Sequence, residues 1–360
     1  MFPNQSIRYK LAPQMRKYDS VRHVWKPFIM FFNEANIKSN VLNLDKFGLR
    51  FNDLNNLKNL DIETNNSIFN EKIFSQYKET AVLVGASTAF GTGASSDTFT
   101  ISSILSKKTN IHFFNLACSA LSGFQEIILF QSFINFLTTT KKIVILSGLN
   151  DLTLINYLSN FDPTWGPHYF SQKYIKGMIQ STLSRRRKLA KFLLDPFLEH
   201  DVNWNSVTIS KLWNLFLKKK NSEKMDLPTK ERLMKTIVSK NFQFWSNIQI
   251  GMGAKITYVL QPFANWCKRE LSVEEQELFN ELKTSSDKNY QNFHKIDEKA
   301  YINYKNFIKQ NCNYFNFDFI DMNECFSNSN LDKKWLFVDR SHLTDLGNEY
   351  LAEFISSKLS

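Results

Sequence analysis

Four side chains of this chain have types and places that suit acyl transfer: a serine, an asparagine, an aspartate and a histidine. Ser87 and Asn150 each follow an apolar run, and Asp339 and His342 lie three positions apart shortly before the C-terminus. A serine hydroxyl becomes a useful nucleophile when a histidine accepts its proton. The histidine in turn needs a carboxylate that holds its tautomer and stabilises the imidazolium. These residues therefore match the parts of a serine hydrolase.

Each of these residues also has an ordinary structural interpretation. Ser87 resembles a turn serine, Asn150 with Asp151 resembles a helix cap, and a lone loop histidine such as His342 is usually packed or exposed. In its structural interpretation, Asp339 pairs with a basic neighbour on the surface. Taken singly, each structural interpretation is the stronger one. The combination, in chain order and with each residue beyond a core element, favours catalysis.

The elements that position these residues alternate between strands and helices from Thr80 onward. Apolar runs predict strands at residues 81–87, 111–117, 142–149, 255–260 and 314–320. Caps and periodicity predict helices at 95–107 (capped by Ser95, Ser96 or Asp97), 122–138 (a Ser122/Gln125 capping box) and 345–356 (capped by Thr344). Strand–helix alternation with short connections implies right-handed crossovers and a parallel sheet. Ligands of such sheets bind beyond the carboxyl ends of the strands.

Two regions lie outside this alternation. Residues 1–79 are predicted to form an N-terminal extension packed on the core domain 80–360; residues 1–40 are basic and are expected to be an arm or a pair of short helices. Gly48 predicts a turn, and Arg50 reaches toward a site or faces water. Residues 160–250, with a basic run at 185–188 and an amphipathic stretch at 230–249, predict a helical insertion over one edge of the sheet.

Composition excludes several classes of function. The net charge of +11 comes without a nucleic-acid-binding motif, so no nucleic-acid partner is expected, although an acidic-polymer binder stays an alternative. None of the four cysteines forms a C-x-x-C pair, and neither a metal nor a cofactor is expected. Cys118 is a rival nucleophile, but a cysteine at an apolar strand end is more often an inert buried thiol. The run Pro27–Phe32 is too short to span a bilayer, and we expect a reduced, cytoplasmic protein.

The blocks Gly85-x-Ser87, Asn115-Leu116-Ala117, Gly148-x-Asn150-Asp151 and Asp339-x-x-His342 together resemble the SGNH hydrolase (GDSL-type esterase/lipase) superfamily. The resemblance covers about residues 80–155 and 250–360. It implies a flavodoxin-like three-layer α/β/α sandwich. It also implies that Ser87 is the nucleophile, that His342 is the base and that Asp339 orients the histidine.

The resemblance further implies an oxyanion hole made by the backbone N–H of Ser87, the backbone N–H at Ala120 and the Asn150 side chain. The sequence departs from the family pattern at two positions. Ala86 stands where many members have an aspartate, and Ala120 stands where members have a glycine. An alanine keeps the N–H, but a positive φ at Ala120 would strain it.

Three functions follow from these patterns. The first is a serine esterase that acts through an acyl-enzyme, with O-acetyl groups of carbohydrates or similar esters as its substrate class. The second is a related O-acyltransferase that passes the acyl group to a sugar. The third is a catalytically degenerate binding protein of the same fold, which the alanines at positions 86 and 120 motivate.

Overall fold

The computed structural model describes residues 6–26, 29–53, 67–157, 226–284 and 298–359. Its centre is a five-stranded sheet in which every neighbouring pair is parallel. The strands are β3 (Thr80–Gly85), β4 (His112–Ala117), β5 (Thr140–Ser147), β6 (Lys255–Leu260) and β7 (Asp318–Asp321). The order across the sheet is β4-β3-β5-β6-β7. Numbered along the chain, this is the 2-1-3-4-5 order of flavodoxin-like folds, so the predicted fold class is confirmed.

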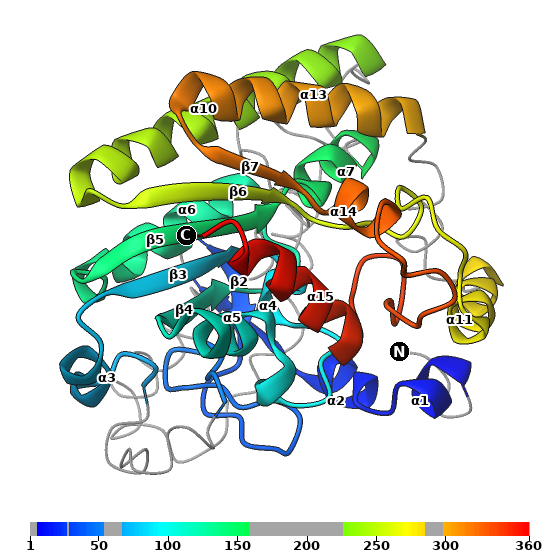
Figure 1. Ribbon diagram of the computed structural model, residues 1–360, viewed down its shortest axis with the longest axis horizontal. Helices are drawn as coiled ribbons and strands as arrows, with labels where there is room; N and C mark the ends of the chain where they lie inside the picture. Colours follow the sequence, from blue (N-terminus) through cyan, green and yellow to red (C-terminus); the bar gives the residue numbers. More distant parts are fainter. Residues whose placement is uncertain (1–5, 27–28, 54–66, 158–225, 285–297, 360) are drawn as a thin grey trace, which may run out of the picture.

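Helices cover both faces of the sheet because the side chains of each strand alternate between two apolar cores. Val82 and Val84 pack in one core, with helices α6, α10 and α13, and Ala81 and Leu83 pack in the other, with α5, α11 and α15. Figure 1 shows α10 beside α13 on one side of the sheet and α15 beside α5 on the other. The helices of these layers are α5 (Ile101–Thr109), α6 (Gly123–Phe133), α7 (Leu149–Tyr157), α10 (Leu227–Met252), α11 (Val273–Thr284), α13 (Glu298–Phe315), α14 (Met322–Ser327) and α15 (Asp345–Ser356).

The described N-terminal residues begin with two short helices, α1 (Ile7–Leu11) and α2 (Met15–Ser20), as expected for the basic segment. An antiparallel pair follows, β1 (His23–Lys26) and β2 (Met30–Asn33), which the sequence did not predict. The predicted turn at Gly48 is present with φ +87°, and a Cβ there would lie 2.6 Å from the Asn33 carbonyl oxygen. Further on lies α3 (Glu71–Gln76).

Two predicted boundaries are wrong. The helix expected from Ser95–Asp97 begins at Ile101, and its N-cap is Thr100, whose side chain accepts a hydrogen bond from the Ser103 N–H. Asp97 opens only a short 3-10 turn, η1 (Asp97–Phe99), because its carboxylate is committed to a buried ion pair with Arg50. Capping preferences alone do not distinguish among the polar residues of this stretch, which include Ser95, Ser96, Asp97 and Thr100.

The last strand is also shorter than predicted. Helix α13 continues to Phe315 and ends before Asn316, whose φ of +57° is the left-handed conformation typical of a helix end. Strand β7 therefore begins at Asp318 rather than at Tyr314. The helical spacing of Tyr304, Ile308 and Cys312, all buried, outweighs the aromatic strand-like pattern that follows them.

The stretch 160–250 divides into two parts. Residues 158–225, with the basic run at 185–188, lie outside the described residues. The amphipathic stretch at 230–249 is confirmed as helix α10, which lies between β5 and β6 in the chain and packs Val238, Phe242 and Trp245 into the core of one sheet face. This part is thus a helix of the α/β layer rather than an addition over the sheet edge.

Candidate active site

Ser87 lies just beyond the carboxyl end of β3, the strand that separates β4 from β5; the chain adds β4 on one side of β3 and then continues with β5 on the other. Gly85 lets the ends of β3 and β5 approach each other, since a Cβ at this position would lie 2.2 Å from the Leu146 carbonyl oxygen. Ser87 then opens the short helix α4 (Ser87–Phe90). It is the only residue from Thr80 to Thr92 that is not fully buried. Local geometry therefore turns the Ser87 hydroxyl out of the core at the place where such sheets bind ligands.

Asp339 and His342 lie on one loop that ends at the N-cap of α15. Val338 N–H donates to the His342 carbonyl oxygen over 2.9 Å, which closes the loop, and the Thr344 side chain caps the helix as predicted. The Asp339 Oδ1 atom accepts the backbone N–H groups of Ser341 (3.0 Å) and His342 (2.9 Å). The spacing Asp-x-x-His thus makes the carboxylate an anchor for the loop that carries its own histidine.

The structure brings these residues together in an unbroken hydrogen-bonded series. His342 Nε2 lies 2.7 Å from Ser87 Oγ, and His342 Nδ1 lies 2.7 Å from Asp339 Oδ2. Both distances are within the range for direct proton transfer between heavy atoms. With Nδ1–H donating to the carboxylate, Nε2 is left as the acceptor for the serine proton.

Asp339 has a further partner that sequence analysis missed. Arg8 Nη1 donates to Asp339 Oδ2 over 2.9 Å, and both side chains are buried. Burial alone would raise the pKa of the Asp339 carboxyl, but the charge and hydrogen bond of His342 and the charge of Arg8 hold it well below its usual range. Arg8 was one of several cations in a basic segment, and no local pattern distinguished it.

The predicted oxyanion residues flank two other strand ends. Ala120 lies on the loop between β4 and α6, and Asn150 lies in the first turn of α7, directly after β5. The Asn150 Nδ2 atom donates to the Leu121 carbonyl oxygen over 2.7 Å, so the two loops are tied to each other. Since β3 lies between β4 and β5, the loops after all three strands converge beside Ser87.

Ala120 has φ +58°, the left-handed conformation that glycine adopts without strain. A positive φ was expected to strain an alanine at position 120, and the φ of Ala120 is positive. For an L-residue the conformation costs about 1 kcal/mol. The family pattern of glycine at this position therefore has a backbone reason, and this chain retains the conformation with an alanine.

Two buried carboxyl groups lie beneath this side of the site. Asp151 Oδ1 accepts the Gly123 N–H over 2.9 Å, and Ser147 Oγ donates to Glu126 Oε1 over 2.7 Å. Burial raises the pKa of Asp151 to about 6. Burial and the nearby charge of Asp151 raise the pKa of Glu126 well above its usual value. Within the part of the chain that the structure describes, no cationic side chain forms an ion pair with either group.

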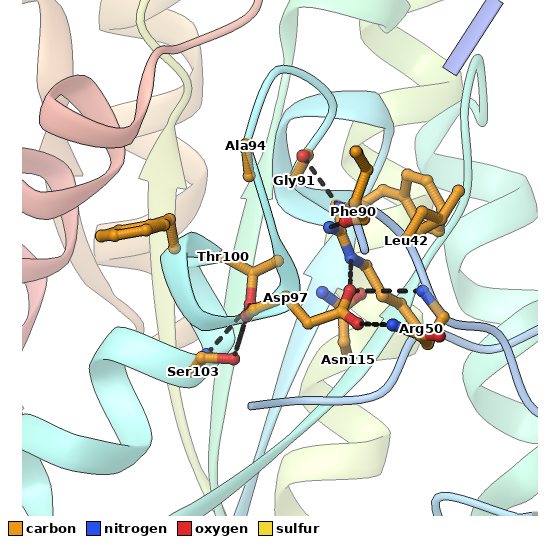
Figure 2. Close-up of polar contacts among 12 residues, drawn as sticks. Leu42, Arg50, Phe90, Gly91, Ala94, Asp97, Thr100, Ser103 and Asn115 are labelled. Carbon is orange, nitrogen blue, oxygen red and sulfur yellow. Dashed lines mark hydrogen bonds and ion pairs between the residues drawn. The ribbon is translucent and has the colours of Figure 1, made fainter. Parts of the chain in front are cut away.

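A buried arginine supports the segment that follows Ser87. Figure 2 shows Arg50 between Asp97 and the end of α4: its Nε donates to Asp97 Oδ1 over 2.8 Å, and its Nη1 donates to the carbonyl oxygens of Phe90 and Gly91. The same Nη1 lies 2.9 Å from the Tyr18 hydroxyl oxygen of α2. Arg50 is thus buried and does not face water; it fixes the backbone that follows Ser87.

Cys118, the rival nucleophile, is fully buried, and burial raises the pKa of its thiol to about 12. A thiol held protonated in this way is a poor nucleophile. Among the described residues, no group of three or more His, Cys, Asp or Glu side chains lies close enough to hold a metal ion. The described helices include none long and apolar enough to cross a bilayer.

No protein-family model and no curated protein matches the sequence. Solved structures do resemble the chain. An acetyl xylan esterase is 11% identical, with 78% of this chain and 100% of that chain covered and a TM-score of 0.38. A variant of an acetyl-xylooligosaccharide esterase from Geobacillus stearmophilus is 11% identical, with 78% of this chain and 94% of that chain covered and a TM-score of 0.39. A lipase/acylhydrolase from Enterococcus faecalis is 10% identical, with 78% of this chain and 95% of that chain covered and a TM-score of 0.35.

At these identities and TM-scores the likeness concerns the fold and says nothing of activity. The order and direction of the chain's own strands place it among the flavodoxin-like α/β folds. The three-layer α/β fold that the sequence predicts is thus confirmed, and the chemistry rests on the residues around Ser87.

Proposed function

We propose that the protein is a serine esterase that works through an acyl-enzyme. The observation that carries the proposal is the series Ser87 Oγ, His342 Nε2, His342 Nδ1 and Asp339 Oδ2, in which each contact measures 2.7 Å. A nucleophile, a base and an orienting carboxylate in this geometry are what acyl transfer to serine needs.

In the proposed reaction, Ser87 Oγ attacks the ester carbonyl carbon while His342 Nε2 takes the hydroxyl proton. The negative charge moves to the carbonyl oxygen, which accepts hydrogen bonds from the N–H groups of Ser87 and Ala120 and from the Asn150 amide. An amide nitrogen carries two hydrogens, so Asn150 Nδ2 can donate to the Leu121 carbonyl and to an oxyanion together.

Collapse of this intermediate breaks the bond to the leaving alkoxide, and the imidazolium of His342 returns the proton to it. The acyl group then remains as an ester on Ser87. Water enters, His342 takes one of its protons, and the same steps release the carboxylic acid and the free serine. Asp339 stays ionised throughout and stabilises the imidazolium in both half-reactions.

For the substrate we propose O-acyl groups, acetyl above all, on a carbohydrate or a similar alcohol, which is the class that the resemblance to the SGNH hydrolases implies. An acyltransferase would use the same acyl-enzyme and differ only in the acceptor. Adding a sugar to the assay separates the esterase from the acyltransferase, since transfer yields an acylated sugar in place of free acid.

The degenerate binding protein remains the second candidate because Ala120 has a positive φ without being glycine. The hydrogen bond between Ser87 and His342 argues against it, since a site that has lost turnover has no need of that contact.

The test is hydrolysis of p-nitrophenyl acetate by the intact chain, by Ser87→Ala and by Ser132→Ala. Ser132 is an exposed serine on α6, and it serves as the matched control. We expect the Ser87 variant to lose activity by at least about 10³-fold and the Ser132 variant to keep it. Equal activity in all three proteins would disprove the proposal.

A further inference from the structure

The oxygen of Asp339 that receives His342 also receives an arginine from the opposite end of the chain. Arg8 and Asp339 are 331 positions apart, and their side chains are 2% and 1% exposed. Arg8 Nη1 and His342 Nδ1 lie 2.9 and 2.7 Å from the same atom, Oδ2. Any charge on the imidazole therefore forms close to a permanent guanidinium charge.

The position of Arg8 is held from two sides. Glu281 of α11 accepts the backbone N–H groups of Ile7 (2.9 Å) and Arg8 (3.0 Å), and it also accepts the Ser6 hydroxyl (2.8 Å). Asp19 of α2 lies 3.6 Å from Arg8 Nε. Figure 1 shows α1 beside α11. Arg8 thus enters the site on a helix that is itself anchored, rather than as a flexible surface cation.

Helix α2 ties the same segment to the other half of the site. The Tyr18 hydroxyl donates to carbonyl oxygens of the turn after α4, at Gly91 or Ala94, and Gln14 Nε2 donates to the Gly93 carbonyl oxygen over 2.8 Å. Residues 6–20 therefore contact both the loop of Asp339 and the turn that follows Ser87.

A buried carboxylate beside a neutral imidazole lacks a counter-charge, which destabilises the ionised form. We propose that Arg8 is a positioning residue of the catalytic site: it supplies this counter-charge and aims Oδ2 at His342. This inference rests on the proposed function. The other charged groups around Asp339 are Asp19, which faces Arg8, and Arg340, the next residue in the loop.

The first test compares Arg8→Gln with Arg8→Lys in the full chain. Glutamine keeps a donor but removes the positive charge that faces Asp339 Oδ2. We expect the pH of half-maximal kcat/KM on the acid side to rise by about one unit. We expect kcat to fall about tenfold, with KM nearly unchanged, because Arg8 is buried away from substrate. Lysine keeps the charge, so the acid limb should stay near that of the wild type while kcat falls less.

Two controls separate charge from folding. Lys10→Gln removes an exposed cation from the same helix and should leave kcat and the acid limb unchanged. Glu281→Gln loosens the anchor of α1 without changing any charge that contacts Asp339, and we expect a lower melting temperature with an unshifted acid limb.

A spectroscopic measurement tests the inference even if the esterase proposal fails. The proton on His342 Nδ1 gives a far-downfield NMR signal when it is held against Asp339. Removing the charge of the second donor to Oδ2 in Arg8→Gln should move this signal, while Lys10→Gln should not. Activity that survives Ser87→Ala would end the esterase proposal and leave this measurement valid.

The inference is overturned if Arg8→Gln folds and shows neither a shifted acid limb nor a moved Nδ1 proton signal. If Arg8→Gln does not fold, Arg8→Lys decides: an acid limb displaced by about one unit in this charge-retaining variant would overturn the inference, and an unshifted limb would support it.

Discussion

The loop of Asp339 and His342 and the loop of Ala120 differ in the electrostatic environment of their buried carboxyl groups. On the first loop, the buried Asp339 carboxylate has five hydrogen-bonded contacts, one of them from the buried cation Arg8, and its pKa is lowered. Beneath the second loop, the buried carboxyls of Glu126 and Asp151 have raised pKa values and no ion pair among the described residues. The proton-transfer half of the site is thus built for a permanent negative charge.

The half that would receive the oxyanion is built differently. Negative charge from Glu126 or Asp151 would oppose an oxyanion. Burial and the nearby charge of Asp151 raise the pKa of Glu126 well above its usual value, which reduces the charge of that carboxyl, whereas a pKa of about 6 leaves Asp151 largely ionised at neutral pH. The backbone there also carries strain at Ala120. We therefore expect variants of the first half to abolish turnover and variants of the second half to tune it.

The largest expected effect is that of His342→Ala. Without the base, Ser87 has no proton acceptor, and we expect kcat to fall by at least about 10³-fold on an activated acyl ester. His23→Ala, at an exposed histidine of β1, is the control and should be unaffected. A His342 variant within tenfold of the wild type would contradict the asymmetry between the halves.

Asn150 should come next. Asn150→Asp keeps the shape of the side chain but removes both amide donors, and loss of one oxyanion donor typically costs about 10²–10³ in kcat. The tie to the Leu121 carbonyl is lost as well. We expect a similar or larger loss from Asn150→Asp than from Asn150→Ala, because a carboxylate repels the oxyanion. Equal kcat in Asn150→Asp and wild type would remove Asn150 from the site.

Asp151 gives a prediction on stability. Burial raises its pKa in the folded state to about 6, above the usual value of 3.8, so the folded state holds the proton longer and stability falls as the pH rises through this interval. Asp151→Asn should therefore raise the unfolding free energy by up to about 3 kcal/mol at pH 8 and by little at about pH 3.5. Denaturant titrations at both pH values measure it.

The control for Asp151 is Asp318→Asn, at a half-exposed carboxylate paired with Lys255. Its variant should show no gain that grows with pH. For Asp339 the sign is reversed. Its pKa is lower in the folded state than in the unfolded state, so its ionised form stabilises the fold above the unfolded-state pKa, and this stabilisation is lost as the pH falls. A stability gain from Asp151→Asn that is equal at both pH values would mean that packing, not charge, is responsible.

Ala120→Gly should have the smallest effect. Glycine relieves the positive φ, and we expect a gain of about 0.5–1 kcal/mol in unfolding free energy. The backbone N–H is retained, so kcat/KM should change by less than about threefold. Ala352→Gly, within helix α15, is the matched control and should lose stability. A large rise in kcat/KM for Ala120→Gly would show that the alanine distorts the oxyanion side.

The parallel sheet and the meeting of Ser87, Asp339 and His342 were predictable from the sequence because they depend on local patterns. Apolar runs mark the strands, and three-residue spacing puts Asp339 and His342 on one loop. The role of Arg8, by contrast, depends on a contact with Asp339, 331 positions away. Asp97 does not cap the helix as predicted, because it pairs with Arg50, a buried arginine 47 positions away. Such partners are chosen by tertiary packing, which composition and periodicity do not encode.

The most direct test of the central claim is covalent labelling of Ser87. A fluorophosphonate reacts with an activated serine, which displaces fluoride and forms a stable phosphonyl ester. We predict a single adduct on Ser87 in the intact chain and in Ser132→Ala, and none in Ser87→Ala, in His342→Ala or after denaturation. No adduct in the folded wild type, or an adduct that persists in Ser87→Ala, would contradict the claim that Ser87 is the nucleophile.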